Sequence, residues 1–407
     1  MDATAALPRS DTKVIGLIST AHFLSHVYML VLPPLFPLLK DVYGVSFTAL
    51  GLALTVFNVA TGLTQAPMGF LVDRFGARAL LIAGLIIEAI AIAAIGIFPT
   101  YWALITLMAI AGLANSVYHP ADYTILSASV GKNRMGRAFS IHTFAGYFGF
   151  AVAPLTMVFL LETVGWRMAL GIVGAVGLAT ALVLAAFASV LKEETPDPAT
   201  KQAQAAATGP QGLKLLLSVP VLMGFLFFVG IAMTNGGFTS FGVSALVTLY
   251  EVDIVQASAP LTAYLFASAA GVLGGGWLAD RTQRHSFVAA GCFIMVGVLV
   301  GCVAAFDLPL TMVTVLFGLA GFFSGMVAPS RDMMIRAVTP AGSTGKVFGF
   351  VSTGFNLGGA ITPLFFGMLL DRMDPNMMFW AISALSILTI VTVLSAGSVS
   401  RRRAAAA

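Results

Sequence analysis

The chain has 407 residues, of which 58% are hydrophobic and only 9% are charged, and its mean hydropathy is +0.96. A soluble domain needs more polar surface than this composition offers, so we expect most of the surface to contact lipid. The net charge of +4 does not indicate nucleic-acid binding, because the charges lie in short segments between apolar stretches, where they orient a protein in the bilayer.

The first residues and the cysteines of the chain limit which targeting signals and disulfides are possible. Residues 1–13 are polar and lack the apolar core of a cleavable signal peptide, so we expect the first helix to be retained. The only cysteines, Cys292 and Cys302, lie in one apolar segment. Ten helical residues separate them by roughly 15 Å, beyond disulfide reach. No structural disulfide, metal or cofactor is expected.

Twelve apolar stretches are long enough to cross about 30 Å of hydrocarbon as helices. We predict spans at about 14–39, 46–72, 79–98, 101–129, 137–161 and 167–190, and then at about 215–247, 256–279, 286–306, 309–338, 346–370 and 376–397. The polar segment 191–214 has too little apolar area to fold alone, so it is expected to be a cytoplasmic linker. The sequence thus predicts an all-α integral membrane protein with two six-helix bundles, residues 1–190 and 215–407.

The distribution of Lys and Arg predicts the orientation of these spans. With the amino terminus inside, most of them lie on the cytoplasmic side: Arg9, Lys13, Arg74, Arg78, Lys132, Arg134, Arg137, Lys192, Lys201, Lys214, Arg281, Arg284, Lys346, Arg401, Arg402 and Arg403. Only Lys40, Arg167 and Arg372 fall outside, while Arg331 and Arg336 lie within a span. Cytoplasmic segments carry the excess of Lys and Arg, so we expect a multi-pass protein of the cell (inner) membrane with both termini cytoplasmic.

The two halves share a pattern of Gly and Pro. Residues 112–155 align without a gap on residues 321–364, which places Pro120 opposite Pro329 and Gly149 opposite Gly358. Shared Gly and Pro imply shared kinks and close helix contacts. We therefore expect two pseudo-symmetric repeats, the build of a transporter that rocks one bundle against the other.

A short charged pattern follows the second span of each half. Residues 69–78 read GFLVDRFGAR, and residues 276–284 read GWLADRTQR. This pattern and the division into six and six spans resemble the major facilitator superfamily over nearly the whole chain. The resemblance implies a conformational latch in which the loop aspartate lies near the start of a helix from the other half. The latch residues would be Gly69, Asp73, Arg74, Gly76, Arg78, Asp280 and Arg281. Alternatively, these loops only end helices and follow the charge rule.

Two shorter patterns narrow the resemblance. His22 and His26 in the first span, and His119 followed by Pro120 in the fourth, are similar to exporters of the fosmidomycin-resistance type. The fifth span contains Gly146 and other Gly and Pro residues that resemble the pattern of proton-driven antiporters. The intramembrane Arg that drug antiporters often carry in the fourth span is absent.

Ionisable side chains inside a span are functional candidates because burying them in hydrocarbon is costly. Asn115, His119 and Asp122 have the i, i+4, i+7 spacing of one helix face, and His22 and His26 lie one turn apart. In the superfamily the first, fourth, seventh and tenth spans line the central cavity, which the resemblance implies here too. The candidate substrate and proton pathway is His22, His26, Asn115, His119, Asp122, Asn235, Arg331, Asp332 and Asn356.

Arg331 occupies the position equivalent to Asp122 in the repeat alignment. Our hypothesis is that Asp122 and His119 handle protons, while Arg331 attracts an anionic substrate or holds Asp122. Alternatively, Asp122 and Arg331 form a structural pair, or Arg331 pairs with Asp332.

Other polar residues in the spans have open roles. His22 and His26 have a spacing known among metal ligands, but no third ligand stands out near them, so a hydrogen-bonded packing role is favoured. Glu88, midway along the third span, is expected to be protonated, paired between helices or near a partner, and it ranks below Asp122 as a proton carrier. His142 is a plausible polar group of the cavity, although hydrogen bonding between helices is the commoner use of such a residue.

These observations favour a secondary active transporter that exports a small organic compound, anionic or drug-like, by proton antiport. Proton-coupled uptake of an organic acid would use the same residues. A membrane sensor or scaffold without transport is the alternative from another class. An embedded enzyme is not expected, because the loops lack a catalytic constellation. The expected partners are a small-molecule substrate, protons and membrane lipid, without nucleic acid, and the expected state is a monomer.

Overall fold

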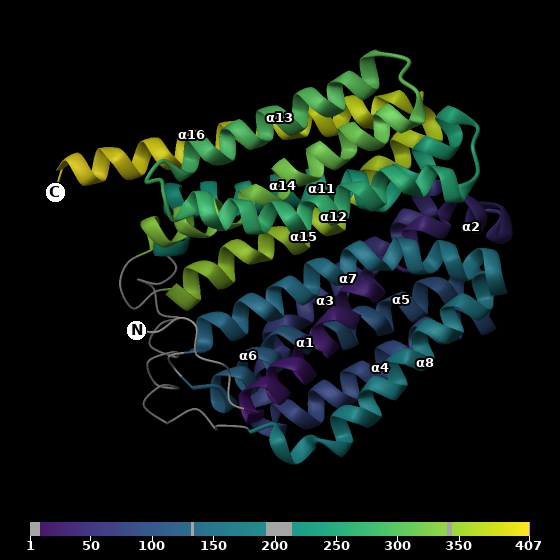
Figure 1. The fold of residues 1–407 in the computed structure, drawn as a ribbon, viewed down its shortest axis with the longest axis horizontal. Coiled ribbons are helices and arrows are strands. Elements are labelled where there is room, and N and C mark those ends of the chain that lie inside the picture. Colours follow the sequence, from purple (N-terminus) through teal and green to yellow (C-terminus); the bar gives the residue numbers. More distant parts are fainter. Residues whose placement is uncertain (1–8, 132–133, 193–213, 340–343, 407) are drawn as a thin grey trace. The chain divides into compact units, whose positions relative to one another are not determined.

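All elements of the described chain are helices (Figure 1). The computed structural model describes residues 9–131, 134–192, 214–339 and 344–406, and for 9–10, 136, 344–346 and 394–406 it describes the backbone alone. Most of the linker expected at 191–214 and the charges of Lys132 and Lys201 therefore lie outside the described residues.

The first half begins with α1 (Arg9–Met29), and a short 3-10 turn, η1 (Pro33–Leu35), leads into α2 (Phe36–Tyr43). The remaining elements of this half are α3 (Phe47–Phe75), α4 (Ala77–Ile97), α5 (Tyr101–Asn115), α6 (Tyr118–Ser129), α7 (Met135–Val164), α8 (Trp166–Ala186) and η3 (Ala188–Val190). The second half comprises α11 (Val219–Tyr250), α12 (Ile254–Ala279), α13 (His285–Ala305), α14 (Leu310–Val338), α15 (Thr344–Arg372) and α16 (Asn376–Ala406).

The described residues contain twelve helical stretches that are long and apolar enough to cross a membrane. The predicted fold, an all-helical membrane protein with twelve spans, is confirmed. Two spans are less regular than the sequence analysis predicted. The first combines α1 and α2, because Pro33 and Pro34 lack the amide hydrogens that a continuous helix needs.

The fourth span is interrupted between α5 and α6. Pro120 lies in the first turn of α6 and has no amide hydrogen to donate to a carbonyl one turn earlier. Side-chain hydroxyls bind carbonyls beside this break: Ser116 donates to Leu113 O at 2.7 Å, and Thr61 of α3 donates to Gly112 O at 2.9 Å. The break ends the single helix face that the sequence analysis assumed for Asn115, His119 and Asp122.

The chain divides into two compact units that differ in one segment from the predicted bundles. Unit 1 comprises Met1–Leu32 and Val56–Pro196, and unit 2 comprises Pro33–Thr55 and Asp197–Ala407. Residues 33–55, which include η1, α2 and the start of α3, therefore pack with the second half of the chain. The domain limits expected at 190 and 215 stay predictions.

The aligned glycines make equivalent helix contacts within each unit. In unit 1, a Cβ added at Gly149 of α7 would meet the carbonyl oxygen of Phe23 on α1. In unit 2, a Cβ added at Gly358 of α15 would meet the carbonyl oxygen of Val229 on α11. Only glycine allows such close approach of two helix backbones. This correspondence supports the internal duplication inferred from the sequence.

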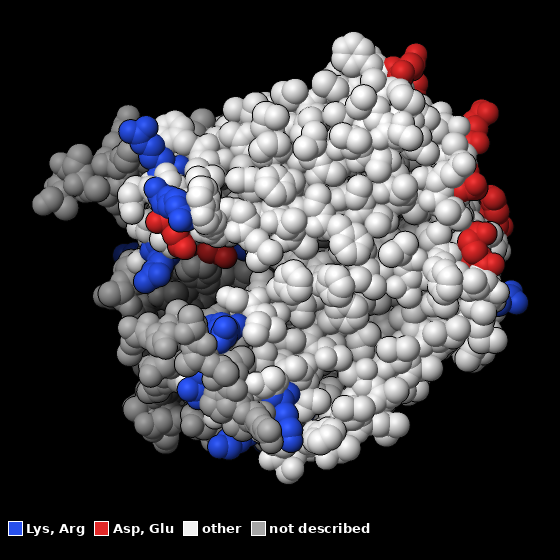
Figure 2. Space-filling view, viewed as in Figure 1, with Lys and Arg blue, Asp and Glu red and all other residues white. Residues whose placement is uncertain are grey.

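Charged residues of unit 2 collect at the ends of its helices. One set of connections, after α11, α13 and α15, carries Glu251, Asp253, Asp307 and Asp374, and the connection after α12 carries Asp280, Arg281 and Arg284. Within unit 2, the space-filling view shows Asp and Glu at the first set of ends, and Lys and Arg together with some Asp or Glu at the other (Figure 2). The orientation of the spans in the membrane stays a prediction.

Candidate functional site

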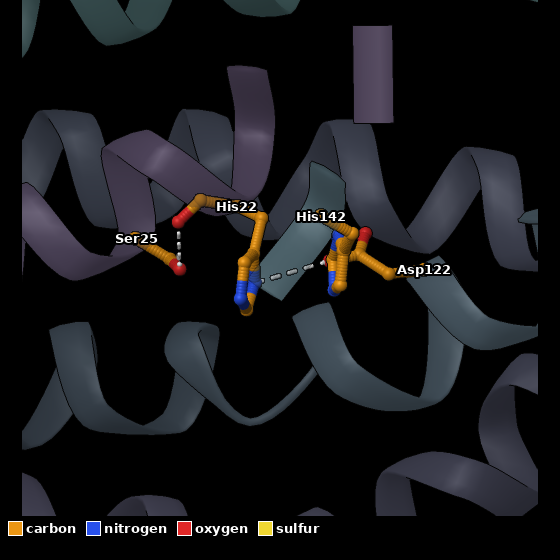
Figure 3. A network of polar contacts seen from close by, with 4 residues as sticks. All are labelled: His22, Ser25, Asp122 and His142. Atoms are coloured by element: carbon orange, nitrogen blue, oxygen red, sulfur yellow. Dashed lines mark hydrogen bonds and ion pairs between the residues drawn. The ribbon is translucent and has the colours of Figure 1, made fainter. Parts of the chain in front are cut away.

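The densest group of titratable side chains in the described residues surrounds Asp122 in unit 1. Oδ2 of Asp122 lies 3.5 Å from Nδ1 of His22 and 3.7 Å from Nε2 of His142 (Figure 3). The Asp122 side chain is 0% exposed, and those of His22 and His142 are 5% and 1% exposed. A buried charge needs compensation, so a proton or a cation at this carboxylate changes the energy of the whole group.

Three helices supply this histidine cluster, which we define as His22, His26, His119, Asp122 and His142. His22 and His26 come from α1, His119 and Asp122 from α6, and His142 from α7. The ring of His22 stacks on that of His142 with centroids 3.8 Å apart, and it lies 4.5 Å from the ring of His26 and 5.3 Å from that of His119. Within α1, the Ser25 hydroxyl donates a hydrogen bond to the carbonyl oxygen of His22 at 2.8 Å.

Gly146 of α7 leaves the space that the α1 histidines occupy. A Cβ at this position would lie 2.9 Å from Nε2 of both His22 and His26. The side of the cluster nearest Tyr123 is more open, because Tyr123 is 47% exposed and its ring lies 5.9 Å from His119 and 5.8 Å from His142.

Asn115 does not join the cluster in the described contacts, although its spacing placed it on the same predicted face. It lies before the break in the fourth span, and its Nδ2 donates to Oε1 of Glu88 on α4 at 3.0 Å. Glu88 is 0% exposed. The pairing between helices is one of the roles that the sequence left open for Glu88.

In unit 2, Arg331 of α14 lies between two aromatic rings. Its guanidinium carbon is 4.9 Å from the centre of the Phe228 ring and 5.3 Å from that of Phe355. Its Nε donates to Oδ1 of Asp332 at 2.8 Å, and the two side chains are 15% and 52% exposed. The pairing of Arg331 with Asp332 is one of the alternatives raised from the sequence. A pairing of Arg331 with Asp122, which belongs to unit 1, stays a prediction.

A second polar group in unit 2 is centred on Asn235. Its Oδ1 accepts hydrogen bonds of 2.9 Å from both the Tyr264 hydroxyl and the Ser324 hydroxyl. Asn235, Tyr264 and Ser324 come from α11, α12 and α14, so this group ties three helices. Asn356, the remaining candidate in the predicted pathway, is half-buried on α15.

The two copies of the predicted latch differ in their local contacts. Asp73 and Arg74 are exposed in the last turn of α3, and Gly76, with φ of +94°, makes the turn into α4 that favours glycine. Arg78 donates to the Ala188 carbonyl at 2.8 Å.

In the second copy, Asp280 and Arg281 are exposed, and Arg281 folds back onto its own helix by donating to Trp277 O at 3.0 Å. In the first copy, a Cβ added at Gly69 would meet no other heavy atom within 4 Å. The latch role of both copies stays a prediction.

The sequence singled out His22, His26, His119 and Asp122, but it named His142 only as a plausible polar group of the cavity and did not place it beside Asp122. The i, i+4 spacing pointed to His22 and His26, and the His-Pro pattern pointed to His119 near Asp122. His142 is a lone histidine on the fifth span, and spacing cannot show that α7 brings it to Asp122. Which polar side chains from different helices meet depends on how the helices pack, and sequence spacing does not reveal it.

A separate hollow in unit 1 does not involve these groups. An apolar groove of about 310 Å³ between α1 and α8 is lined by Gly16, Leu17, Thr20, Val176, Ala179, Thr180, Val183 and Leu184. This lining contains no titratable side chain, so the chemistry belongs to the histidine cluster.

Comparisons with known proteins agree with the twelve-span architecture. The chain is 24% identical over 404 residues to the fosmidomycin resistance protein of Escherichia coli (strain K12), covering 96% of this chain and 94% of that protein. It is 24% identical to the multi-drug resistance efflux pump PmrA of Streptococcus pneumoniae, covering 89% and 90%. In structure it resembles a bacterial homologue of the human lysosomal transporter Spinster, with a TM-score of 0.77, 15% identity and 97% of each chain covered.

The family comparison covers almost all of the chain. The sequence profile of the Major Facilitator Superfamily matches residues 18–302 and 232–406. The match confirms the expectation of a secondary transporter rather than an embedded enzyme. Twelve spans, repeated halves and this match lead to one conclusion: the chain belongs to the Major Facilitator Superfamily of membrane transporters.

Proposed function

We propose that this transporter exports a small anionic organic compound in exchange for protons, by alternating access. The observation that carries the proposal is the fully buried Asp122 carboxylate with two imidazoles within 3.7 Å of one oxygen. An ionisable group inside a membrane span is costly unless it serves a function or is compensated.

In the proton step, Asp122 and the imidazoles beside it in the histidine cluster bind and release a proton. Histidine changes charge near neutral pH, burial disfavours isolated charge, and a carboxyl group within 3.7 Å of two imidazoles can exchange a proton with them. A proton that enters from one side of the membrane is shared by Asp122, His22 and His142. When the proton leaves to the other side, the Asp122 carboxylate loses the positive charge beside it. We propose that this change in charge couples proton flow to the transport cycle.

The substrate step uses Arg331 in unit 2. A guanidinium stays charged, and it can bind a carboxylate, sulfonate or phosphonate through two parallel hydrogen bonds. Asp332 occupies one side of this guanidinium at 2.8 Å, and it is 52% exposed. A substrate anion therefore binds by displacing Asp332, and the Phe228 and Phe355 rings hold the guanidinium plane in position.

The direction of transport follows the relatives' names. One relative is named a fosmidomycin resistance protein and another a multi-drug resistance efflux pump, and export of a toxic compound is one route to resistance, so export is the direction we propose. Proton-coupled uptake of an organic acid remains the competing direction, because the same residues serve both.

The test uses purified protein in liposomes loaded with a small phosphonate, with fosmidomycin as the first probe and organic acids as the second. An inward proton gradient should expel the compound if the protein is an antiporter, and accumulate an external compound if it is a symporter. A protein that moves none of these probes under any gradient is better explained as a sensor or scaffold.

Two variants separate the proton step from the substrate step. Asp122→Asn should abolish gradient-driven efflux and retain exchange of the probe without a gradient. Arg331→Ala should lose both, whereas Arg336→Ala, an exposed arginine at the end of the same helix, should retain both. Full gradient-driven efflux in both Asp122→Asn and Arg331→Ala would rule out the proposed roles.

A further inference from the structure

Three histidines of unit 1 lie within binding distance of one metal ion. His22, His119 and His142 each offer a ring nitrogen, and these nitrogens lie within 4.8 Å of one another. They come from α1, α6 and α7, so their meeting reflects the packing of three helices rather than a local sequence pattern.

The spacing fits a tetrahedral transition-metal site after small side-chain movements. Nitrogen ligands at about 2.0–2.1 Å from Zn²⁺ lie roughly 3.3 Å apart. Metal binding therefore requires rotations of the imidazoles that bring these nitrogens closer together. Asp122 supplies a fourth, anionic ligand, because its Oδ2 is already 3.5 Å from His22 Nδ1 and 3.7 Å from His142 Nε2.

The same side chains have buried polar atoms that bind nothing else among the described residues. Nδ1 of His22 and of His119, both ring nitrogens of His142 and both carboxylate oxygens of Asp122 have no hydrogen-bond partner there. Buried polar atoms are paired in the great majority of cases, and unpaired ones require an explanation. Three neighbouring imidazoles and one carboxylate therefore have buried nitrogen and oxygen atoms that can donate electron pairs to one cation.

We infer that His22, His119, His142 and Asp122 bind one divalent transition-metal ion of the Zn²⁺ class. Imidazole suits zinc, copper, nickel and iron, whereas Mg²⁺ and Ca²⁺ prefer ligand sets made of oxygen. The half-buried His119 and the exposed Tyr123 beside it leave the ion a way in from one side. His26 is not among the ligands, because it does not belong to the group whose ring nitrogens lie within 4.8 Å of one another. The ion occupies the same atoms that share the proton in the proposed function, so metal and proton compete for this site, and the metal inference does not need proton coupling to hold.

The test measures metal binding directly, by equilibrium dialysis of the purified full chain against Zn²⁺ and by the visible absorption of tetrahedral Co²⁺. The affinity tag must be free of histidine. We expect about one ion per chain, as a single site with four protein ligands requires. Binding should also raise the Tm of the protein, because the ligand favours the folded state.

Single substitutions identify the ligands. His119→Gln and His142→Gln should each weaken Zn²⁺ binding by at least roughly tenfold, the lower end of what loss of a supporting residue costs at metal sites. The matched control is His285→Gln, since His285 is the one histidine outside the cluster and lies at the start of α13 in unit 2. It should bind zinc like the unaltered chain.

The outcomes that overturn the inference are specific. The inference is overturned if the unaltered protein binds no zinc, if His119→Gln and His142→Gln both bind zinc as tightly as the unaltered protein, or if His285→Gln loses zinc binding. Each variant is first checked by size-exclusion chromatography and by its helix content, and Asp122→Asn replaces any variant that fails to fold. Dialysis involves no transport, so failure here is distinct from failure of the proposed function.

Discussion

At the scale of single residues, the site depends on small side chains as much as on titratable ones. His22 and His26 can reach the position beside α7 only because residue 146 is glycine. The cluster therefore has a steric requirement that is separate from its charge chemistry.

We predict that Gly146→Ala displaces both histidines and abolishes proton-driven transport. The added methyl group would be 2.9 Å from each Nε2, and overpacking of this kind costs about 1–3 kcal/mol. Melting temperature in detergent and transport in liposomes measure the two effects. Gly171→Ala on α8 is the control, because a Cβ there meets nothing within 4 Å. Normal transport by Gly146→Ala would contradict the steric argument.

Glu88 gives a second prediction at this scale. Its described partners are neutral, the amide of Asn115 and the hydroxyl of Tyr118, so we expect Glu88→Gln to keep an acceptor oxygen and retain stability and transport. Glu88→Ala leaves the buried amide unpaired, which costs about 1–3 kcal/mol. Thermal unfolding of both variants tests this difference. A Glu88→Gln protein of normal stability that cannot couple protons would instead make Glu88 a coupling carboxylate.

The features that could be predicted from the sequence depend either on local composition or on residues close together in the chain. Spans follow from apolar length, and His22 with His26 follows from helical spacing. The Glu88–Asn115 pair could not be predicted, because the break at Ser116 and Val117 turns Asn115 away from the face of Asp122. Pro120 was the available signal for that break.

At the scale of elements, a carboxylate on α15 binds the N-terminus of α3 within unit 2. The Asp371 carboxylate of α15 accepts from the backbone N–H of Phe47 at 2.9 Å and of Thr48 at 2.8 Å, and from the Thr48 hydroxyl at 2.6 Å. A carboxylate is favoured at a helix N-terminus, where backbone N–H groups lack helical partners.

We predict that Asp371→Ala destabilises the protein by about 0.5–2 kcal/mol, the range that applies when a side-chain acceptor is lost from the N-terminus of a helix. The Tm of the purified protein measures this loss. Asp307→Ala, which removes an exposed carboxylate from the connection between α13 and α14, should leave the Tm nearly unchanged. Equal effects of the two substitutions would show that Asp371 acts through its charge alone and not through the cap.

At the scale of the whole molecule, the charge distribution predicts which loops face the cytoplasm. In a chain whose Cys292 and Cys302 are replaced by Ala, a membrane-impermeant maleimide added to intact cells should label Asp307→Cys and not Gln283→Cys. Residue 283 follows α12 and residue 307 follows α13, so a single span separates them. Labelling of Gln283→Cys in intact cells would reverse the predicted orientation.

Duplicated halves began with the same helices and have since diverged in chemistry. Four of the five histidines lie in the first half, whereas the aromatic-flanked Arg331 lies in the second. Such a separation lets ligand preference evolve in one repeat without disturbing ion chemistry in the other. Hybrid proteins that join this first half to the second half of a relative are thus a rational route to new specificities.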